Sequence, residues 1–285
     1  MGELEPIDLH HQSAERTIAA YLLETDDGPA LFDCGPSSTI AALKEGLAAR
    51  GLQLADVRHL LLSHIHLDHA GAADTLVREH PALQVHVSEI GAPHLVDPER
   101  LESSARRLYG DTFDTLWGEL APVPPENVHV VGERVLGLDC FPTPGHASHH
   151  VCYLDRDGTL WAGDAAGVRI LPAGRTVLPP TPPPDVDVEE WQRTLDEIER
   201  RGPERLALVH FGVAEDPVRH FAALRLELYD WAEFVLGGAS EDEFIAYCRT
   251  ELADAGEDVG GYDTAMPLWQ SYRGLKRWAD KQAQV

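Results

Sequence analysis

Basic residues and cysteine are scarce in this 285-residue sequence. It has 23 Lys and Arg against 48 Asp and Glu, which gives a formal net charge of −25 with histidine neutral. Such a surface repels phosphate backbones, so we expect no nucleic-acid partner held by a broad basic face. The few cysteines form no C-x-x-C pair, which predicts buried free thiols rather than a disulfide framework. They are Cys34, Cys140, Cys152 and Cys248.

Long apolar runs are also missing. No stretch approaches about 18 uninterrupted apolar residues, so we expect no membrane span and no membrane partner. The amino-terminal sequence MGELEPIDLHH has no basic segment followed by an apolar one, which predicts a cytoplasmic protein rather than a secreted one. The hydrophobic fraction of 44% and the charged fraction of 25% are ordinary for a globular chain, so global disorder is excluded.

Strand and helix patterns alternate up to about residue 212. Short apolar runs bounded by turn residues predict strands, and a spacing of three and four predicts helices. The expected strands are 17–24, 30–32, 59–62, 84–87, 128–131, 134–141, 150–154, 159–162 and 205–209. The expected helices in this part are 38–50, 73–79 and one that begins near Asp187.

The remainder of the sequence is typical of helices. Asp216 followed by Pro217 predicts one helix start, and the capping box Ser240-x-x-Glu243 predicts a second. We therefore divide the chain into a body, 1–212, and a helical tail, 213–285, that packs on it. An acidic, helix-prone insertion at 97–118 within the body is a candidate lid.

The strongest chemical signal is His64-x-His66-x-Asp68-His69, which directly follows the apolar run 59–62. In extended backbone, residues two apart face the same way, so His64 and His66 can reach one ion. The chain must then turn, and Asp68 and His69 can point towards a second position. Imidazole nitrogen and carboxylate oxygen are donors that suit Zn²⁺, and also Fe or Mn.

Further ligands must come from elsewhere, because one loop cannot complete two coordination shells. His146, Asp164 and His210 each stand at the end of an apolar run, where a loop tip is expected. Gly145 and Gly163 precede the first two and allow a tight backbone turn. Each of the three is a weak signal alone, and the set gains its weight from following the first motif.

These seven residues, in this order, resemble the metallo-β-lactamase-fold hydrolase superfamily over about residues 15–212. The resemblance implies an α/β fold, a four-layer αββα sandwich with the metals at one edge between two sheets, here followed by a C-terminal helical extension. Because all seven ligand positions are filled, the sequence resembles the dinuclear members of the superfamily, such as hydroxyacylglutathione hydrolases and homoserine-lactone lactonases. True lactamases usually lack the bridging Asp, which leaves β-lactam hydrolysis as a secondary activity.

The resemblance also implies a ligand assignment. His64, His66 and His146 would hold the first ion, Asp68, His69 and His210 the second, and Asp164 would bridge the two. The implied cofactors are two divalent ions, foremost Zn²⁺, with Fe or Mn as alternatives. Such ions ionise a bridging water near neutral pH, and the hydroxide would attack the carbonyl of an ester, lactone or thioester. Asp68 would orient that hydroxide as the catalytic residue.

Three further side chains are candidates for contact with a small-molecule substrate. His149 would border the site if it faces inward from the strand after His146. Arg169 and Arg175 lie in the loop after Asp164, and a guanidinium matches a substrate carboxylate. In the tail, three aromatic residues are candidates either for a homodimer surface or for one wall of the pocket. They are Trp269, Tyr272 and Trp278.

Two other function classes use the same fold. A mononuclear iron oxidoreductase that resembles persulfide dioxygenases needs the same ligand types, so the ligands alone leave it open. A nuclease is disfavoured by the acidic charge and by the lack of a large insertion between Asp164 and His210. The sequence therefore predicts a dinuclear metallohydrolase, with the iron oxidoreductase as its alternative.

Overall fold

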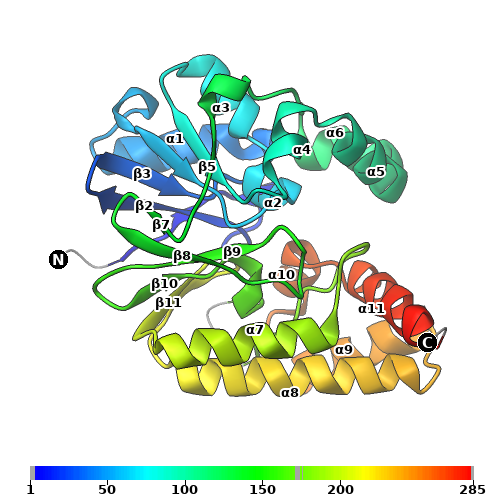
Figure 1. Ribbon diagram of the computed structural model, residues 1–285. Helices are drawn as coiled ribbons and strands as arrows, with labels where there is room; N and C mark the ends of the chain where they lie inside the picture. The colour runs from blue at the N-terminus through cyan, green and yellow to red at the C-terminus, as the bar shows by residue number, and fades with distance from the viewer. Residues whose placement is uncertain (1–3, 171–173, 175, 284–285) are drawn as a thin grey trace.

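The computed structural model describes residues 4–170, 174 and 176–283, and two six-stranded sheets face each other at its centre (Figure 1). The first sheet has the order β1-β2-β3-β4-β5-β6. Its strands are β1 (Ile7–Asp8), β2 (Ala19–Thr25), β3 (Gly28–Phe32), β4 (His59–Leu61), β5 (Gln84–Val87) and β6 (Val128–Val130). Strands β1 to β3 are antiparallel neighbours, whereas β3 to β6 run parallel, so the carboxyl ends of these four strands meet at one edge.

The second sheet has the order β12-β11-β10-β9-β8-β7. Its strands are β7 (Arg134–Val135), β8 (Leu138–Pro142), β9 (Val151–Leu154), β10 (Thr159–Trp161), β11 (Arg205–Leu208) and β12 (Gly212–Ala214). Only the β10–β11 pair is parallel among these pairings. The single strand expected at 134–141 is instead the hairpin β7–β8, because Leu136 and Gly137 both take positive φ and turn the chain.

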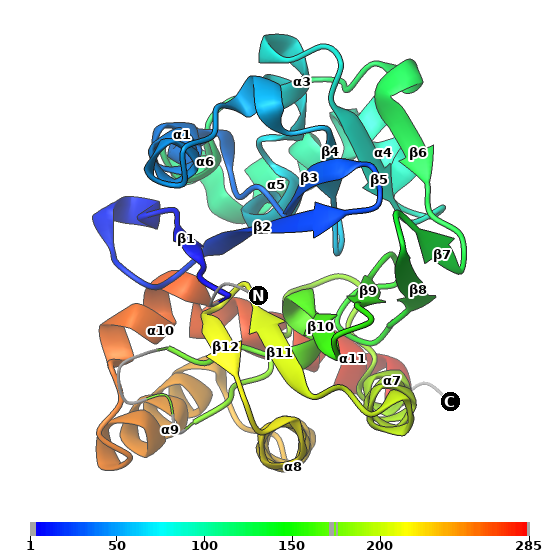
Figure 2. The same cartoon turned by 90° about the vertical axis from the view of Figure 1, so that its left-hand side faces the viewer.

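Helices cover the outer faces of both sheets, which gives the four layers of an αββα sandwich (Figures 1 and 2). On the first sheet lie α1 (Ile40–Ala49), α3 (Ala73–Glu79), α4 (Ala92–Val96), α5 (Glu99–Tyr109) and α6 (Phe113–Trp117). On the second lie α7 (Val188–Arg201), α8 (Pro217–Leu236), α9 (Glu241–Asp254), α10 (Val259–Ala265) and α11 (Leu268–Gln282). The short α2 (Leu67–Ala70) follows β4.

The part of the chain that the structure describes also contains six single-turn 3₁₀ helices. They are η1 (His11–Ser13), η2 (Ser37–Thr39), η3 (Leu54–Asp56), η4 (Gly110–Thr112), η5 (Pro125–Asn127) and η6 (Gly163–Ala166). Among the described residues, no helix combines the length and the apolarity that a membrane span requires.

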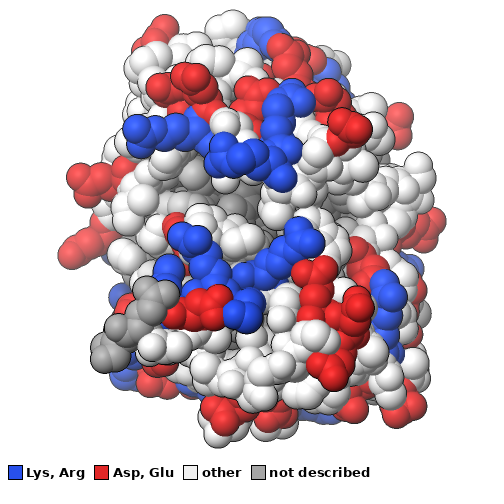
Figure 3. Space-filling view, turned by 90° about the vertical axis from the view of Figure 1, so that its right-hand side faces the viewer, with Lys and Arg blue, Asp and Glu red and all other residues white. Residues whose placement is uncertain are grey.

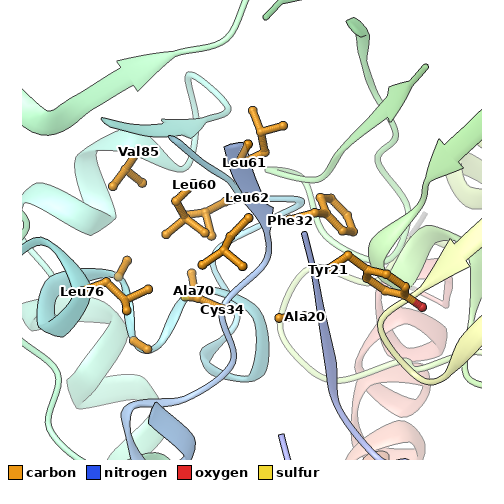
Figure 4. Close-up of a cluster of buried hydrophobic side chains, with 14 of the residues drawn as sticks. Ala20, Tyr21, Phe32, Cys34, Leu60, Leu61, Leu62, Ala70, Leu76 and Val85 are labelled. Atoms are coloured by element: carbon orange, nitrogen blue, oxygen red, sulfur yellow. The ribbon is translucent and has the colours of Figure 1, made fainter. Parts of the chain in front are cut away.

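Apolar side chains explain why the layers stack. Strand β4 has β3 and β5 on either side and is buried throughout, as expected for an inner parallel strand with an unbroken apolar run. Figure 4 shows Leu60, Leu62 and Phe32 in this cluster, with Tyr21 reaching towards the second sheet. The Tyr21 hydroxyl lies 2.7 Å from the Leu208 carbonyl oxygen, so this buried side chain connects β2 to β11.

The helix starts predicted for the tail are confirmed. The Asp216 side chain accepts a hydrogen bond from the Arg219 amide, with Pro217 in the first turn. Ser240 and Glu243 form the expected capping box of α9. Helices α8 to α11 share one buried apolar cluster with the second sheet. All four cysteines are buried free thiols, as the sequence predicts.

Candidate metal centre

The predicted ligands come from four segments that meet at one edge of the two sheets. The loop after β4 and the start of α2 supply four of them, and the second sheet supplies the other three. From the first sheet come His64, His66, Asp68 and His69, and from the second come His146 after β8, Asp164 in η6 after β10, and His210 after β11. Four of the seven, His64, His66, His146 and His210, lie in loops or turns, whereas Asp68 and His69 lie in α2 and Asp164 in η6. All seven follow the end of a strand, so the rigid sheets position them.

Three imidazoles and one carboxylate form the first group. Ligand atoms of His64, His66, His146 and Asp164 all lie within 4.8 Å of one another. His146 Nε2 lies 3.3 Å from His64 Nε2 and 3.0 Å from His66 Nδ1. The same nitrogen lies 3.4 Å from Oδ2 of Asp164. This group could hold one metal ion.

Asp164 also takes part in a second group, with Asp68, His69 and His210. Its other oxygen, Oδ1, lies 3.1 Å from His69 Nε2 and 3.5 Å from His210 Nε2. Asp68 Oδ2 completes the group at 3.4 Å from His210 Nε2. One carboxylate therefore offers a separate oxygen to each group, which is the geometry a bridging ligand needs. The two groups also divide the residues as the resemblance implies.

Hydrogen bonds on the far side of the rings fix which nitrogen faces the centre. His146 Nδ1 donates to the Pro180 carbonyl at 2.7 Å, and His210 Nδ1 donates to the Thr17 carbonyl at 2.6 Å. A carbonyl oxygen can only accept, so each Nδ1 carries the proton and each Nε2 keeps a free lone pair. Metal-binding imidazoles depend on such outer partners for their orientation and tautomer.

Asp33 supports both groups and was missed by sequence reasoning. It is fully buried at the end of β3, and its Oδ2 lies 2.7 Å from His69 Nδ1. The same oxygen accepts a 2.7 Å hydrogen bond from the Ser63 hydroxyl, whose Oγ lies 3.0 Å from His64 Nδ1. The available signal was the position of Asp33 after a strand that runs parallel to β4, since such strands end at the same edge.

The donor atoms at the centre fit cations. His69 Nε2 and Asp164 Oδ1 are both buried, and neither has a hydrogen-bond partner among the described residues. They lie 3.1 Å apart without hydrogen-bond geometry, so both face a shared point. Unpaired buried polar atoms are costly, and a cation bound between them would satisfy both. Imidazole and carboxylate are also the donor types that divalent transition metals prefer.

The buried charges shift the pKa values of the cluster in opposite directions. Burial lowers the pKa of His66 to about 3, with the neighbouring His146 adding to the effect. Burial would also lower the pKa of His69, but the carboxylates of Asp164, Asp68 and Asp33 raise it well above its usual value. Burial raises the pKa of Asp164 less than the imidazoles of His69, His146 and His210 lower it, so this carboxyl is ionised. The ligands of the first group are thus neutral imidazoles beside an ionised carboxylate.

Glycine precedes two of the ligands for a steric reason. Gly145 has a φ of +125°, and a Cβ there would lie 2.3 Å from the Cα of Trp191 on α7. Gly163 has a φ of +48°, and a Cβ there would lie 2.6 Å from Ser63 Oγ. No side chain fits at either position, so the glycines let the loops that carry His146 and Asp164 approach their neighbours closely.

A cavity of about 530 Å³ opens onto the centre, where it reaches His66, Asp68 and Asp164. The insertion contributes Leu101, Leu108 and Tyr109 among its lining residues, and the tail contributes Met266 and Gln270. The Tyr109 hydroxyl lies 3.2 Å from Gln270 Oε1, which joins α5 to α11 across the cavity. Both the insertion and the tail therefore shape the pocket, and the role of the insertion as a lid stays a prediction.

The candidate substrate residues have different positions. His149 is buried and lines the cavity, with its ring centroid 5.4 Å from that of His66. Arg169 does not line it, and its guanidinium donates to the Val213 carbonyl at 2.7 Å, so the geometry gives no support to contact with a substrate carboxylate. Arg175 lies outside the described residues. His11 also lines the cavity and stacks on Trp117 with ring centroids 5.4 Å apart.

The three aromatic residues of the tail, which were candidates for a homodimer surface, make contacts within the chain. Trp278 is buried and donates to Glu189 at 3.0 Å. The Tyr272 hydroxyl donates to the Ala239 carbonyl, and Trp269 stands edge-on to Tyr109 with ring centroids 6.3 Å apart. A homodimer stays a prediction.

Comparison with known proteins places this centre in a family. The model of the metallo-beta-lactamase superfamily matches residues 14–210, a range that includes all seven candidate ligands. The chain belongs to this superfamily. The fold and the resemblance at superfamily level are therefore confirmed, and the superfamily is one of metallohydrolases.

Several relatives share part of the sequence. YobT of Bacillus subtilis is 29% identical over 156 residues, which are 53% of this chain and 63% of that protein. ST1585 of Sulfurisphaera tokodaii is 26% identical over 197 residues, 66% of this chain and 70% of that protein. An atrochrysone carboxyl ACP thioesterase of Pseudocercospora fijiensis is 27% identical over 131 residues, 46% of this chain and 31% of that protein. The chain thus spans less than two thirds of the length of YobT and about a third of that thioesterase.

Solved structures share the fold. The crystal structure of ST1585 covers 97% of this chain and 99% of its own, with a TM-score of 0.66 and 20% identity. TTHA1623, solved in a di-iron-bound form, covers 79% of this chain and 97% of its own, with a TM-score of 0.54 and 24% identity. At these identities the likeness establishes the architecture alone.

Proposed function

We propose that the protein is a dinuclear metal-dependent hydrolase that cleaves a carboxylic ester, lactone or thioester. The observation that carries the proposal is the double use of Asp164, which offers Oδ2 to one group of three imidazoles and Oδ1 to a second group. His64, His66 and His146 would hold one divalent ion, and Asp68, His69 and His210 the other. Zn²⁺ suits these donors best, and iron is the alternative because TTHA1623 was solved in a di-iron-bound form.

Two ions bound in these groups supply a water ionised near neutral pH and a Lewis acid for a carbonyl oxygen. The chain's own residues orient and shield this chemistry. Asp68, the most exposed of the three acidic groups at the centre, lines the cavity and can orient an incoming water by accepting a hydrogen bond from it. The imidazoles of His69 and His210 hold the Asp68 pKa below its usual value against the effect of burial, so its carboxyl group is ionised and accepts hydrogen bonds.

The cavity supports an organic carbonyl substrate rather than a bulky polymer. Its lining is mostly apolar, and about 530 Å³ is within the range of small-molecule pockets. The thioesterase relative hydrolyses, by its name, an acyl thioester, which supports that bond type as a candidate here. The branch of the superfamily, whether closer to hydroxyacylglutathione hydrolases or to lactonases, belongs to this proposal.

The test is a panel of lactone, thioester, aryl-ester, phosphodiester and β-lactam substrates with metal-reconstituted protein. We expect turnover of at least one carboxylic substrate, slow or no turnover of the β-lactam and none of the phosphodiester. Asp68→Ala should abolish this turnover while the circular dichroism spectrum stays unchanged. A carboxylic panel without turnover in fully metal-loaded protein, or full turnover by Asp68→Ala, would refute the proposal.

The same preparation separates the alternative, a mononuclear iron oxidoreductase. An iron oxidoreductase would contain one iron per chain and would consume oxygen when glutathione persulfide is added. A dinuclear hydrolase would contain two ions per chain and would consume no oxygen, because hydrolysis changes no oxidation state. The paired groups around Asp164 are the reason to favour the second outcome.

A further inference from the structure

The cavity beside the metal centre has walls suited to an alkyl chain. The insertion lines one side with Leu101, Ala105 and Leu108, and the tail and the loop that precedes α7 line the other with Met266 and Pro182. Burial of each methylene in such a pocket favours binding by about fourfold. A substrate that fills this space would therefore carry a hydrophobic acyl group.

The outer rim of the cavity is basic, although the chain carries a net charge of −25. Arg100 and Arg107 on α5 line the cavity from one side. On the other side, exposed cations of α11 line a neighbouring depression of about 410 Å³, and we call them the α11 basic face. They are Arg273, Lys276, Arg277 and Lys281, and the carboxylate of Asp280 also lines the depression. Figure 3 shows Lys and Arg gathered on both sides of a hollow on this face of the molecule.

Part of the α11 basic face has no internal counter-charge. Arg273 pairs with Glu241, and Lys276 pairs with Asp280. Among the described residues, the Arg277 guanidinium hydrogen-bonds only to the Pro184 carbonyl oxygen, at 3.3 Å, and neither Arg277 nor Lys281 has an ion pair. An ordinary solvated face of an acidic protein would be rich in carboxylates. These two cations instead remain available to an anion.

One contact joins the basic face to the cavity. Pro184, which accepts from Arg277, is itself a lining residue of the cavity. An anionic group held at Arg277 and Lys281 would thus belong to a molecule whose other end enters the cavity and reaches the metal centre. The arrangement fits a substrate with an apolar acyl end, a carbonyl group in the middle and a charged end.

We propose that this protein hydrolyses acyl thioesters of a small phosphate-bearing thiol of the coenzyme A type, with the acyl chain in the cavity and the phosphates on the α11 basic face. The inference rests on the proposed hydrolase function and names its substrate class. Water adds to the carbonyl carbon to form a C–O bond, and the C–S bond breaks. The sulfur leaves with the electron pair and takes up a proton, so the products are a carboxylic acid and a free thiol.

The overall charge favours a small carrier over a protein carrier. An acidic carrier protein would bring a wide negative surface against a chain of charge −25, and like charges repel. A small phosphorylated thiol touches only the local cations. Charge effects beyond about 8 Å are largely screened at physiological salt, so the distant carboxylates oppose it little.

The test compares two thioesters with the same octanoyl group, one on coenzyme A and one on N-acetylcysteamine, which has no phosphate. In metal-loaded protein carrying Arg277→Glu and Lys281→Glu, we expect KM for octanoyl-coenzyme A to rise at least about tenfold with kcat little changed. KM for the N-acetylcysteamine thioester should stay the same. Added salt should raise KM for octanoyl-coenzyme A in the unchanged protein only. Arg156→Glu, an exposed charge reversal on the β9–β10 turn, is the matched control and should behave as the unchanged protein.

Three outcomes decide the matter. Equal KM effects on both thioesters, or none on either, would overturn the phosphate site while leaving the hydrolase function intact. A carrier-protein thioester with the lower KM and the greater sensitivity to the α11 variants would overturn the choice of a small carrier. If neither thioester is turned over, calorimetry with coenzyme A alone still tests the site: binding lost in the double variant supports it, and no binding to the unchanged protein refutes it.

Discussion

Asp33 Oδ2 lies 2.7 Å from His69 Nδ1, and both side chains are fully buried. The carboxylate holds the ring so that Nε2 faces Asp164, and through the Ser63 hydroxyl it also reaches His64. Asp33 is therefore not a candidate ligand itself, but it orients one imidazole in each of the two groups, His69 directly and His64 through Ser63. Such outer partners commonly change metal affinity by about 10- to 100-fold.

Asp33→Asn should weaken binding at the second group by about 10- to 100-fold, because His69 loses its charged acceptor. Asparagine tolerates the φ of 51° at this position, so the fold should be retained. Metal titration followed by calorimetry measures the effect. Asp27→Asn, which changes an aspartate 3.2 Å from His59 in the same half of the molecule, is the control and should leave metal affinity unchanged. Equal affinities for the Asp33 variant and the unchanged protein would contradict the role of Asp33.

His210→Ala should reduce the metal content from about two ions per chain to about one, because His210 belongs to the second group only. Asp164→Ala should weaken both sites, since its two oxygens face different groups. Elemental analysis after dialysis against a weak chelator measures both variants. The division of ligands is wrong if His210→Ala loses both ions or retains both.

Ala105→Phe should shorten the range of accepted acyl chains. Ala105 lines the cavity on α5, and a phenyl group there would exclude roughly two methylenes, which corresponds to about a tenfold higher KM for an octanoyl substrate. An acetyl substrate should be unaffected. Ala222→Phe on the exposed face of α8 is the matched control. A parallel change in KM for both chain lengths would show that the acyl group lies elsewhere.

Glu227 on α8 should make stability depend on pH. Burial, followed by the nearby Asp230 and Glu251, raises its pKa to about 7. Between the ordinary pKa near 4.5 and 7, the folded chain binds a proton that the unfolded chain has lost, so the free energy of unfolding falls as pH rises through this window. The loss should be about 1–3 kcal/mol, reduced from the full shift because the side chain is partly exposed.

Glu227→Gln should remove this dependence, because glutamine stays neutral at every pH in the window. Urea unfolding at pH 5 and at pH 8 compares the two proteins, with the exposed Glu126→Gln as control. The prediction fails if the unchanged protein is not destabilised between pH 5 and pH 8 relative to the Glu227 variant.

The sequence predicts most of the sheet elements because their patterns are local. Residues 73–79 and 84–87 form α3 and β5 as expected, since apolar periodicity and breaking residues mark both ends. Helix α10 was missed, because Val259-Gly-Gly offers neither helix propensity nor an apolar stripe. Tertiary packing stabilises it instead, through the buried Tyr262, whose hydroxyl donates to the Thr176 carbonyl.

In the metal centre too, residues within one short segment could be predicted from the sequence, whereas contacts between distant segments could not. The ligands from His64 to His69 can be predicted because four candidate ligands, three His and one Asp, fall within one short segment. Asp33 and the carbonyl oxygen of Pro180 act only through contacts across 36 and 34 residues of sequence, respectively, and no periodicity records such pairings. The position of His11 in the cavity depends on a loop in which His10 and Gln12 take positive φ, which composition does not reveal.

The proposed chemistry depends on seven side chains that hold two ions and share Asp164 between them. Anomalous diffraction from a crystal of zinc-loaded protein, recorded above and below the zinc edge, locates these ions. We expect two peaks, one contacted by His64, His66 and His146, the other by Asp68, His69 and His210, with Asp164 in contact with both. A single peak, or two peaks that do not share Asp164, would contradict it.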